Sequence, residues 1–130
     1  MTGPSLADYR EAANLRAALR AFLRRSEEIS RRNGLTPRQY LLLLMVKGAP
    51  DGSERSTITD LVERLALTQS TVTELVQRAQ DAELLVREPS SSDGRVVYLR
   101  LTPRGDQLMT AAFNELGAER ETLLRLIRQD

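Results

Sequence analysis

Two short amphipathic segments joined by a tight turn constrain the fold more than any other feature of the sequence. Thr57 and Thr68 stand at helix N-cap positions, and each precedes apolar residues that recur at three- and four-residue spacing. The apolar positions are Ile58, Leu61, Val62 and Leu65 in the first segment and Val72, Leu75, Val76 and Ala79 in the second. Each segment can bury only one narrow stripe, and the turn between them, Ala66-Leu67, is short. The pattern predicts a helix-turn-helix.

After Ala82 the hydrophobic period changes from helical to alternating. Residues 84–87 and 95–101 are expected to form two strands, and the polar loop from Ser90 to Gly94 closes them into a β-hairpin. A helix-turn-helix followed directly by a hairpin is a winged helix. In that arrangement the second short helix, 69–82, can lie in a DNA major groove while the wing, 87–100, reaches the neighbouring minor groove.

Longer helices flank this unit. Residues 5–33 are predicted to form one helix of about 40 Å, and residues 103–130 a last helix that Gly117 interrupts. Thr36 is the predicted N-cap of a helix at 37–47, with Gln39 at the capping-box position. This helix is apolar on nearly all sides, so it should be the buried centre of the fold. The long apolar stripe of 5–33 could pack within the chain, but its length favours a second subunit. The residues expected in that dimer interface are Leu15, Leu19, Phe22, Leu116, Leu123 and Ile127.

These elements predict a fold that is mainly α with a small β-hairpin. The whole chain, 1–130, is expected to be one domain. Its winged helix-turn-helix, 35–102, would lie between two dimerisation helices at 5–33 and 103–130.

The composition argues against an enzyme. Cysteine and histidine are both absent, which removes thiolate catalysis, disulfides and the usual nitrogen and sulfur ligands of metals. The acids mostly stand beside arginines on helical faces, so neither a catalytic pair nor a cofactor is expected. No apolar run approaches the roughly 18 residues of a membrane span, and the N-terminus does not resemble a signal peptide. We therefore expect a cytoplasmic protein.

Polar residues on the outer face of the second short helix and at the wing tip are the candidate DNA contacts. They are Gln69, Ser70, Thr71, Thr73, Glu74, Gln77, Arg78, Ser92, Asp93, Gly94 and Arg95. Gln69, Thr73 and Gln77 can hydrogen-bond base edges, whereas Arg95 is the cation that a narrow minor groove attracts. Asp93 is expected to orient Arg95 or to bond loop amides, because phosphates repel a carboxylate. The alternative for the helix is an ordinary solvated face.

The charge of this region leaves a second class of function open. Residues 53–104 carry seven arginines against eight acids, although a protein that binds phosphates is normally basic there. The alternative is a winged-helix protein-interaction module that has lost DNA binding and partners another regulator.

Residues 35–108 resemble the multiple antibiotic resistance regulator (MarR) family. The matching segments are "GLTPRQYLLLLMV", "ITDLVERLALTQSTVTELVQRAQDAELLVRE" and "SSDGRVVYLRLTPRGDQL". The Asp-x-Arg of the wing and the Leu-Thr-x-x-Gly after it are the most specific parts. The resemblance implies a homodimeric transcription regulator, usually a repressor, on double-stranded DNA with a palindromic operator. It also implies release of the DNA by a small aromatic or phenolic acid.

The sequence departs from the family pattern in three places. Most members carry a further C-terminal helix, so dimerisation here is expected to rest on 5–33 and 103–130. Glu83 stands where glycine is usual, and a left-handed backbone there would cost about 1 kcal/mol. Glu74 replaces a common basic residue; it could accept a hydrogen bond from a cytosine amino group or pair with Arg78 one turn later.

An effector pocket is only weakly marked in the sequence. Tyr40, Met45 and Phe22 could line a cleft between the long helix and the buried one, with Arg16 holding a carboxylate. Core packing for the first three and solvent exposure for Arg16 is the alternative.

Overall fold

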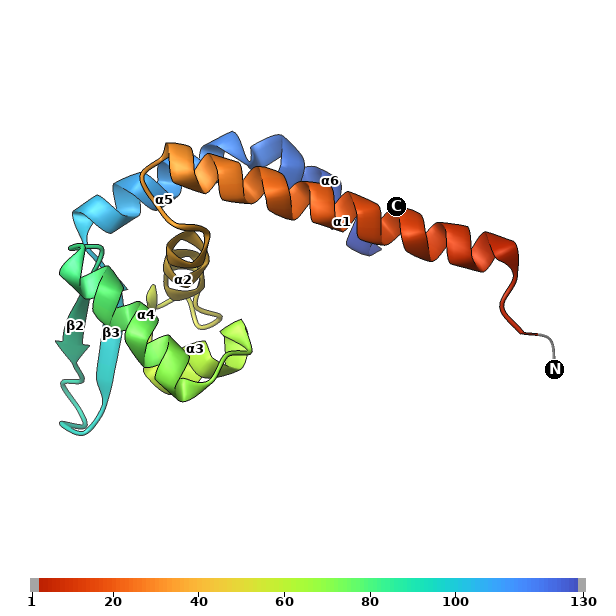
Figure 1. The fold of residues 1–130 in the computed structure, drawn as a ribbon. Helices are drawn as coiled ribbons and strands as arrows, with labels where there is room; N and C mark the ends of the chain where they lie inside the picture. Colours follow the sequence, from red (N-terminus) through yellow and green to blue (C-terminus); the bar gives the residue numbers. More distant parts are fainter. Residues whose placement is uncertain (1–2, 129–130) are drawn as a thin grey trace.

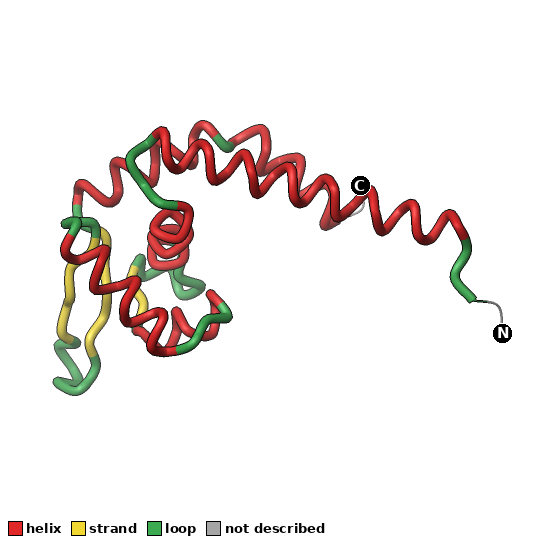
Figure 2. The backbone as a smooth tube through the Cα atoms, in the orientation of Figure 1, coloured by secondary structure: helices red, strands yellow, loops and turns green. Residues whose placement is uncertain are grey.

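The computed structural model describes residues 3–128, which form a mainly helical protein with a small antiparallel sheet (Figures 1 and 2). The elements in chain order are α1 (Leu6–Arg32), α2 (Pro37–Lys47), β1 (Arg55–Ser56), α3 (Ile58–Leu65), α4 (Gln69–Asp81), β2 (Leu85–Pro89), β3 (Val97–Leu101), α5 (Pro103–Glu115) and α6 (Gly117–Arg128). The helix-turn-helix and the wing lie together at one end, and α1 extends away from them (Figure 1). None of the helices described between residues 3 and 128 is long and apolar enough to cross a lipid bilayer.

The predicted helix starts are confirmed by their caps. Thr36 and Gln39 form a reciprocal capping box at the start of α2, and Thr57 does the same with Asp60 at α3. The Thr68 hydroxyl accepts a hydrogen bond from the backbone N–H of Thr71 at the start of α4. Short-range hydrogen bonds therefore set the beginning of each helix of the winged unit, and the sequence alone reveals them.

Two left-handed residues end the helices of the helix-turn-helix. Ala66, with φ of 54°, follows α3 and forms the turn. Glu83, with φ of 61°, follows α4 and leads into β2. The sequence leaves open whether Glu83 has a left-handed backbone or the helix ends differently; the backbone is left-handed, which costs the fold about 1 kcal/mol at this non-glycine residue.

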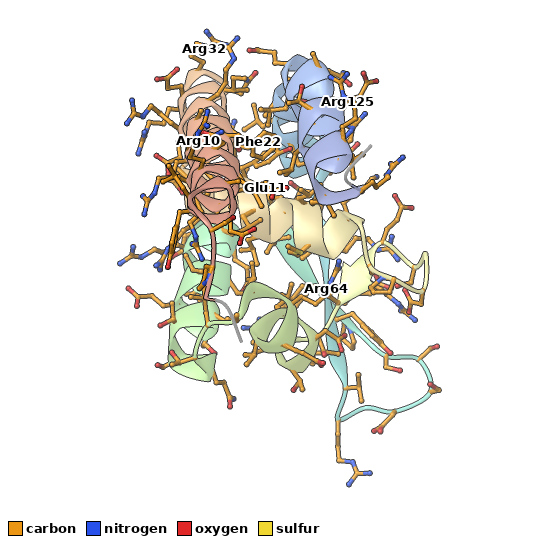
Figure 3. The ribbon with its side chains drawn as sticks, turned by 90° about the vertical axis from the view of Figure 1, so that its right-hand side faces the viewer. Arg10, Glu11, Phe22, Arg32, Arg64 and Arg125 are labelled. Atoms are coloured by element: carbon orange, nitrogen blue, oxygen red, sulfur yellow. The ribbon has the colours of Figure 1, made fainter. Side chains whose placement is uncertain are left out.

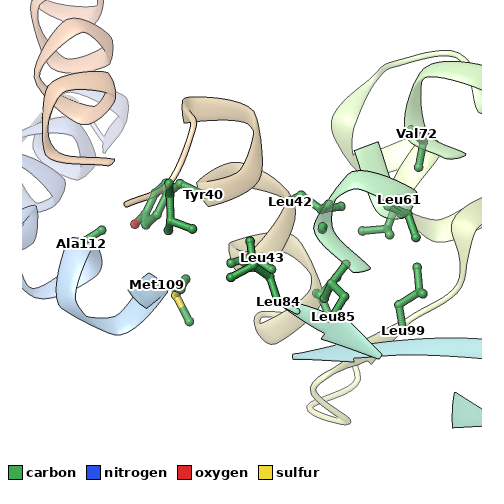
Figure 4. Close-up of a cluster of buried hydrophobic side chains, with 14 of the residues drawn as sticks. Tyr40, Leu42, Leu43, Leu61, Val72, Leu84, Leu85, Leu99, Met109 and Ala112 are labelled. Carbon is green, nitrogen blue, oxygen red and sulfur yellow. The ribbon is translucent and has the colours of Figure 1, made fainter. Parts of the chain in front are cut away.

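The core forms around α2, as its sequence predicts. Leu42, Leu43 and Val46 are fully buried, and α2 contacts α1, α3, α4, α5 and strands β1 and β3 (Figure 4). The further core residues from α3, α4, the sheet and α5 are Leu61, Val72, Val76, Ala79, Leu84, Leu85, Leu99, Met109 and Ala112. The burial of α2 is not complete, because Leu41 is 41% exposed, but its buried sides fix where α3, α4, the sheet and α5 lie relative to one another.

The sheet contains one strand that the sequence analysis missed. Its order is β1-β3-β2, with Arg55 opposite Arg100 and Ser56 opposite Leu99. At two residues, β1 is too short to show an alternating pattern.

The strand β2 begins one residue later and ends two residues later than the predicted 84–87, and the bond from the backbone N–H of Ser90 to the carbonyl of Val96 continues its pairing toward the tip. The strand β3 begins two residues later than the predicted 95–101, because the backbone N–H of Val96 bonds the carbonyl of Asp93 within the tip.

A close junction joins the wing to the C-terminal helices. The Thr102 hydroxyl caps α5 and also donates to the carbonyl of Glu83, at 2.6 Å. A Cβ atom at Gly105 would lie 2.2 Å from the carbonyl oxygen of Leu84. The Leu-Thr-x-x-Gly segment therefore has a structural explanation, since only glycine lets α5 approach the root of β2 this closely.

Helices α1 and α6 lie side by side and form an arm. The predicted last helix is divided at Leu116, and Gly117 begins α6. The helix α6 runs alongside the middle of α1, while the N-terminal part of α1 continues beyond it (Figure 1). We use the term arm below for α1 together with α6.

Candidate nucleic-acid interface

The outer face of α4 carries the polar residues that the sequence predicts. Gln69, Ser70, Thr73, Glu74 and Gln77 line a shallow surface hollow along this helix. On the opposite side, Val72, Val76 and Ala79 are buried in the core, and Leu75 packs against it. The helix therefore presents amides, hydroxyls and one carboxylate together.

Two side chains of this face are held by acids one turn away. Arg78 is the only cation of α4, and its Nη2 lies 2.5 Å from Oε1 of Glu74. Gln77 donates from Nε2 to Oδ1 of Asp81 at 3.0 Å. The alternative weighed for Glu74, pairing with Arg78, is thus present in the free chain. These side chains are exposed, so each pairing is weak and can be exchanged for another partner.

The wing tip is folded by its own side chains. The Ser90 hydroxyl accepts hydrogen bonds from the backbone N–H groups of Ser92 and Asp93. Oδ1 of Asp93 accepts from the backbone N–H of Arg95 at 3.0 Å and lies 3.6 Å from Nε of the same residue. Asp93 therefore bonds a loop amide, as considered for it, and lies within weak ion-pair distance of the Arg95 guanidinium. The side chain of Arg95 remains 94% exposed, so its guanidinium projects from an ordered loop.

Ion pairs fasten the root of the wing. Arg100 of β3 donates to Glu88 of β2 at 2.7 Å, and Arg55 of β1 donates to the same carboxylate at 3.1 Å. The Arg55 guanidinium also stacks 3.9 Å from the centre of the Tyr98 ring. The hydrogen bond from Arg100, with desolvation opposing it and Arg55 assisting, holds the pKa of Glu88 below its usual range. Sequence reasoning missed the part played by Arg55 because it depends on β1.

The wing and α4 lie on the same end of the protein. Figure 1 shows the hairpin extending alongside α4, with its tip directed away from the arm. Arg87 of β2 donates to Gln80 of α4 at 3.2 Å and connects the two elements directly. The predicted contact residues of the helix and of the tip therefore share one region of the surface.

A cavity of about 400 Å³ lies between α1, α2 and the C-terminal helices. Phe22 and Tyr40, two of the residues considered for an effector pocket, line it, and Phe22 lies between α1 and the C-terminal helices (Figure 3). Met45 packs against the core and Arg16 is exposed, as the alternative given for these two residues predicts. Burial raises the pKa of Tyr40 above its usual value, with the charge of Arg120 acting in the opposite direction.

Arg38 of α2 and Arg120 of α6 are cations that line this cavity. The Arg120 guanidinium lies 4.1 Å from the centre of the Phe113 ring. Its Nη1 atom is buried, and it has no hydrogen-bond partner among the residues that the structure describes. Sequence reasoning missed Arg120 because nothing in its local pattern distinguishes it from the other arginines of the helix.

The six predicted dimerisation residues fall into two groups. Leu15, Leu19 and Ile127 are exposed along the arm, and Phe22 and Leu123 are half-buried beside the cavity. Leu116 is only 4% exposed and belongs to the core of its own chain, so we exclude it from the proposed interface.

The sequence of the winged unit identifies the protein family to which it is related. Residues 33–96 match the MarR family. This stretch of the chain belongs to the MarR family. The chain is similar to the HTH-type transcriptional repressor MdtR of Bacillus subtilis (strain 168), with 30% identity over 97 residues that cover 75% of this chain and 57% of MdtR. The chain spans between 57% and 66% of the length of the curated relatives that it matches.

Solved structures of MarR family proteins share the fold. The regulator AbsC from Streptomyces coelicolor superposes with a TM-score of 0.70 at 19% identity, covering 96% of this chain and 80% of AbsC. A point mutant of MepR from S. aureus, solved bound to an oligodeoxyribonucleotide, gives 0.68 at 21% identity, covering 87% of this chain and 80% of MepR. The mainly helical winged-helix architecture is therefore that of MarR proteins.

Proposed function

We propose that the chain is a homodimeric, sequence-specific DNA-binding transcription regulator that represses by occupying promoter DNA. The observation that carries the proposal is the shared surface of α4 and the wing, where a polar helix face lies beside an ordered tip with an exposed arginine. MepR, which has the same fold, has been solved with an oligodeoxyribonucleotide, and MdtR is named a repressor. Such a role would place the protein in the cytoplasm.

In the proposed complex, α4 lies in the major groove and the wing reaches the adjacent minor groove. Gln69, Thr73 and Gln77 offer amides and hydroxyls to base edges, whereas Ser70 and Thr71 at the helix start suit phosphates. Arg95 enters the minor groove, and Asp93 restricts the orientations that its guanidinium can adopt. Ser92 and Gly94 form the rest of the wing tip and lie beside the sugar-phosphate backbone of the DNA.

The arm supports the homodimer. Leu15 and Leu19 are exposed on α1, and Ile127 on α6 is 68% exposed. A water-exposed stripe of this length is unfavourable for an isolated chain. A second copy that laid its own arm against this one would cover both stripes and would present two α4 helices to a palindromic site.

We propose that the cavity between α1, α2 and the C-terminal helices receives a small aromatic acid that releases the DNA. Its walls carry the rings of Phe22, Tyr40 and Phe113, and the buried Nη1 of Arg120 is available for a carboxylate. Arg120 thus takes the role first considered for Arg16. Benzoate should bind the wild-type protein and weaken its binding to duplex DNA, and Arg120→Gln should abolish both effects.

Fluorescence polarisation on random-sequence duplex DNA, at low and at moderate salt, tests the DNA-binding proposal. We expect binding that weakens steeply with salt, because each phosphate contact releases condensed counterions. Arg95→Ala should make the salt slope shallower by roughly one unit for each subunit. Arg24→Ala, which removes the same charge from the exposed surface of α1, should leave the slope nearly unchanged. Absence of binding at every salt concentration would instead support the protein-interaction module.

A further inference from the structure

The only cation of α4 is neutralised within the helix itself. Glu74 and Asp81 are the acids of residues 69–81, and Arg78 is paired with Glu74. The helix proposed to enter the major groove therefore has a formal charge of −1. Phosphates on either side of the groove repel the acids of this helix, and Arg78 can contact a phosphate only if its pair with Glu74 opens.

The ion pair can open at little cost. The side chains of Arg78 and Glu74 are 70% and 61% exposed, and an exposed pair at i and i+4 contributes only about 0.3–0.5 kcal/mol. A phosphate or a guanine edge is a stronger partner for the guanidinium. Whether the exchange is favourable then depends on what becomes of the carboxylate, which cannot remain without a partner where DNA removes its water.

Among the four bases, cytosine offers the major groove a single hydrogen-bond donor, its N4 amino group, and no acceptor. Glu74 faces the same hollow as Gln69, Thr73 and Gln77, so its carboxylate lies among the residues proposed to meet base edges. A cytosine at this position could replace the guanidinium as the hydrogen-bond donor to Glu74.

We propose that Glu74 is a specificity-determining residue that exchanges Arg78 for a cytosine amino group. In the free protein Glu74 holds Arg78. On a site with cytosine opposite Glu74, the carboxylate bonds the base and Arg78 moves to the DNA. On other sequences Glu74 keeps Arg78 and remains a repulsive charge, which lowers affinity for non-specific DNA. This inference rests on the proposed DNA-binding function.

The test begins with selection of preferred duplexes from a random pool by the wild-type protein and by Glu74→Gln. We expect the wild-type pool to contain a C·G pair at one position of each half-site, and the Glu74→Gln pool to lose it. On the selected duplex, replacing this C·G pair by T·A should weaken wild-type binding roughly 5- to 100-fold. The same replacement should weaken Glu74→Gln by less than about threefold.

Salt titrations on random duplex DNA provide the second readout. Glu74→Gln should bind more tightly than wild type and should steepen the salt slope by roughly one unit per subunit, because Arg78 is free to contact a phosphate. In an Arg78→Gln background, the Glu74→Gln change should no longer alter the slope. Glu28→Gln, an exposed acid on α1, is the matched control for net charge and should behave as wild type.

The outcomes separate this inference from the function on which it rests. If wild type and Glu74→Gln bind duplex DNA with the same sequence preference and the same salt slope, the role of Glu74 is overturned and the DNA-binding function stands. If neither protein binds duplex DNA at any salt concentration, the proposed function is wrong and the inference fails with it.

Discussion

The winged unit and the arm differ in how far one chain completes them. Around α2, side chains from α3, α4, the sheet and α5 bury Leu42, Leu43 and Val46 entirely. Along the arm, Tyr9 is 61% exposed and Ile127 is 68% exposed, although both are large apolar residues. The two regions have helices of similar regularity, so local structure does not explain the difference.

The comparison indicates that a segment of this chain can be helical without burying its apolar side chains. The caps of α1 and its many arginines favour a helix whatever lies beside it. Burial needs a partner surface, which the winged unit finds within the chain. For the arm we propose that a second copy supplies it.

The largest expected effect comes from a cavity placed in the winged unit. Leu43→Ala should lower the free energy of unfolding by about 2–5 kcal/mol, because Leu43 is fully buried. Urea titrations followed by circular dichroism would measure this loss. Leu19→Ala on the arm should give a loss that changes with protein concentration, since its burial would depend on dimerisation. If both variants lost the same free energy of unfolding at every protein concentration, Leu19 would be buried within its own chain and the arm would not differ from the winged unit.

Charge placed in the arm should separate the subunits without unfolding the winged unit. The double variant Leu15→Glu, Leu19→Glu should sediment as a monomer while wild type sediments as a dimer, because each glutamate would have to be buried in the interface. Its affinity for a palindromic duplex should fall roughly 100-fold or more through lost bivalency. Leu15→Gln, Leu19→Gln is the uncharged control. A dimeric double-glutamate variant would contradict the proposed interface.

A smaller change in the free energy of unfolding is expected from a substitution just after the end of α4. Glu83→Gly should raise the free energy of unfolding by up to about 1 kcal/mol, because Glu83 has a left-handed backbone that glycine adopts without strain. Thermal unfolding would measure the gain. Ala82→Gly is the control, since Ala82 has a negative φ and should not gain stability. If Glu83→Gly were less stable than wild type, the Glu83 side chain would stabilise the fold by more than its left-handed backbone destabilises it.

The smallest effect is a dependence on pH at the root of the wing. The folded state depresses the pKa of Glu88 below 4.5, mainly through the hydrogen bond from Arg100. The stability that this carboxylate contributes is therefore present above about pH 4.5 and is lost as pH falls through the lower folded value. Glu88→Gln should be less stable than wild type near neutral pH, and the two unfolding curves should converge in acid. A constant difference at every pH would show that the ion pairs do not contribute.

The features that sequence reasoning predicted correctly are local ones. The N-caps at Thr36, Thr57 and Thr68 form hydrogen bonds to residues three positions later, so a short window contains both partners. The burial of α2 follows from its continuous apolar composition. The left-handed backbone of Glu83 is one of two alternatives that the sequence leaves open, raised by the glycine that is usual at this position in the MarR family.

The features that were missed depend on pairs far apart in the chain. The strand β1 exists because Arg55 lies opposite Arg100, and two residues show no period of their own. Arg120 enters the cavity only because α6 packs beside α1, and Leu116 is buried by the core rather than by the arm. The contact roles of the α4 and wing residues stay predictions, since the structure places these side chains together without a partner.

The contact between Gly105 and Leu84 has a consequence for how the two regions influence each other. A Cβ atom at Gly105 would lie only 2.2 Å from the carbonyl oxygen of Leu84, so the first turn of α5 packs directly against the residue that precedes β2. A tilt of α5 must therefore displace β2 by a comparable amount. In a dimer, the angle at which the two α5 helices diverge would set the span between the two wing tips, and hence the operator length that both can reach at once.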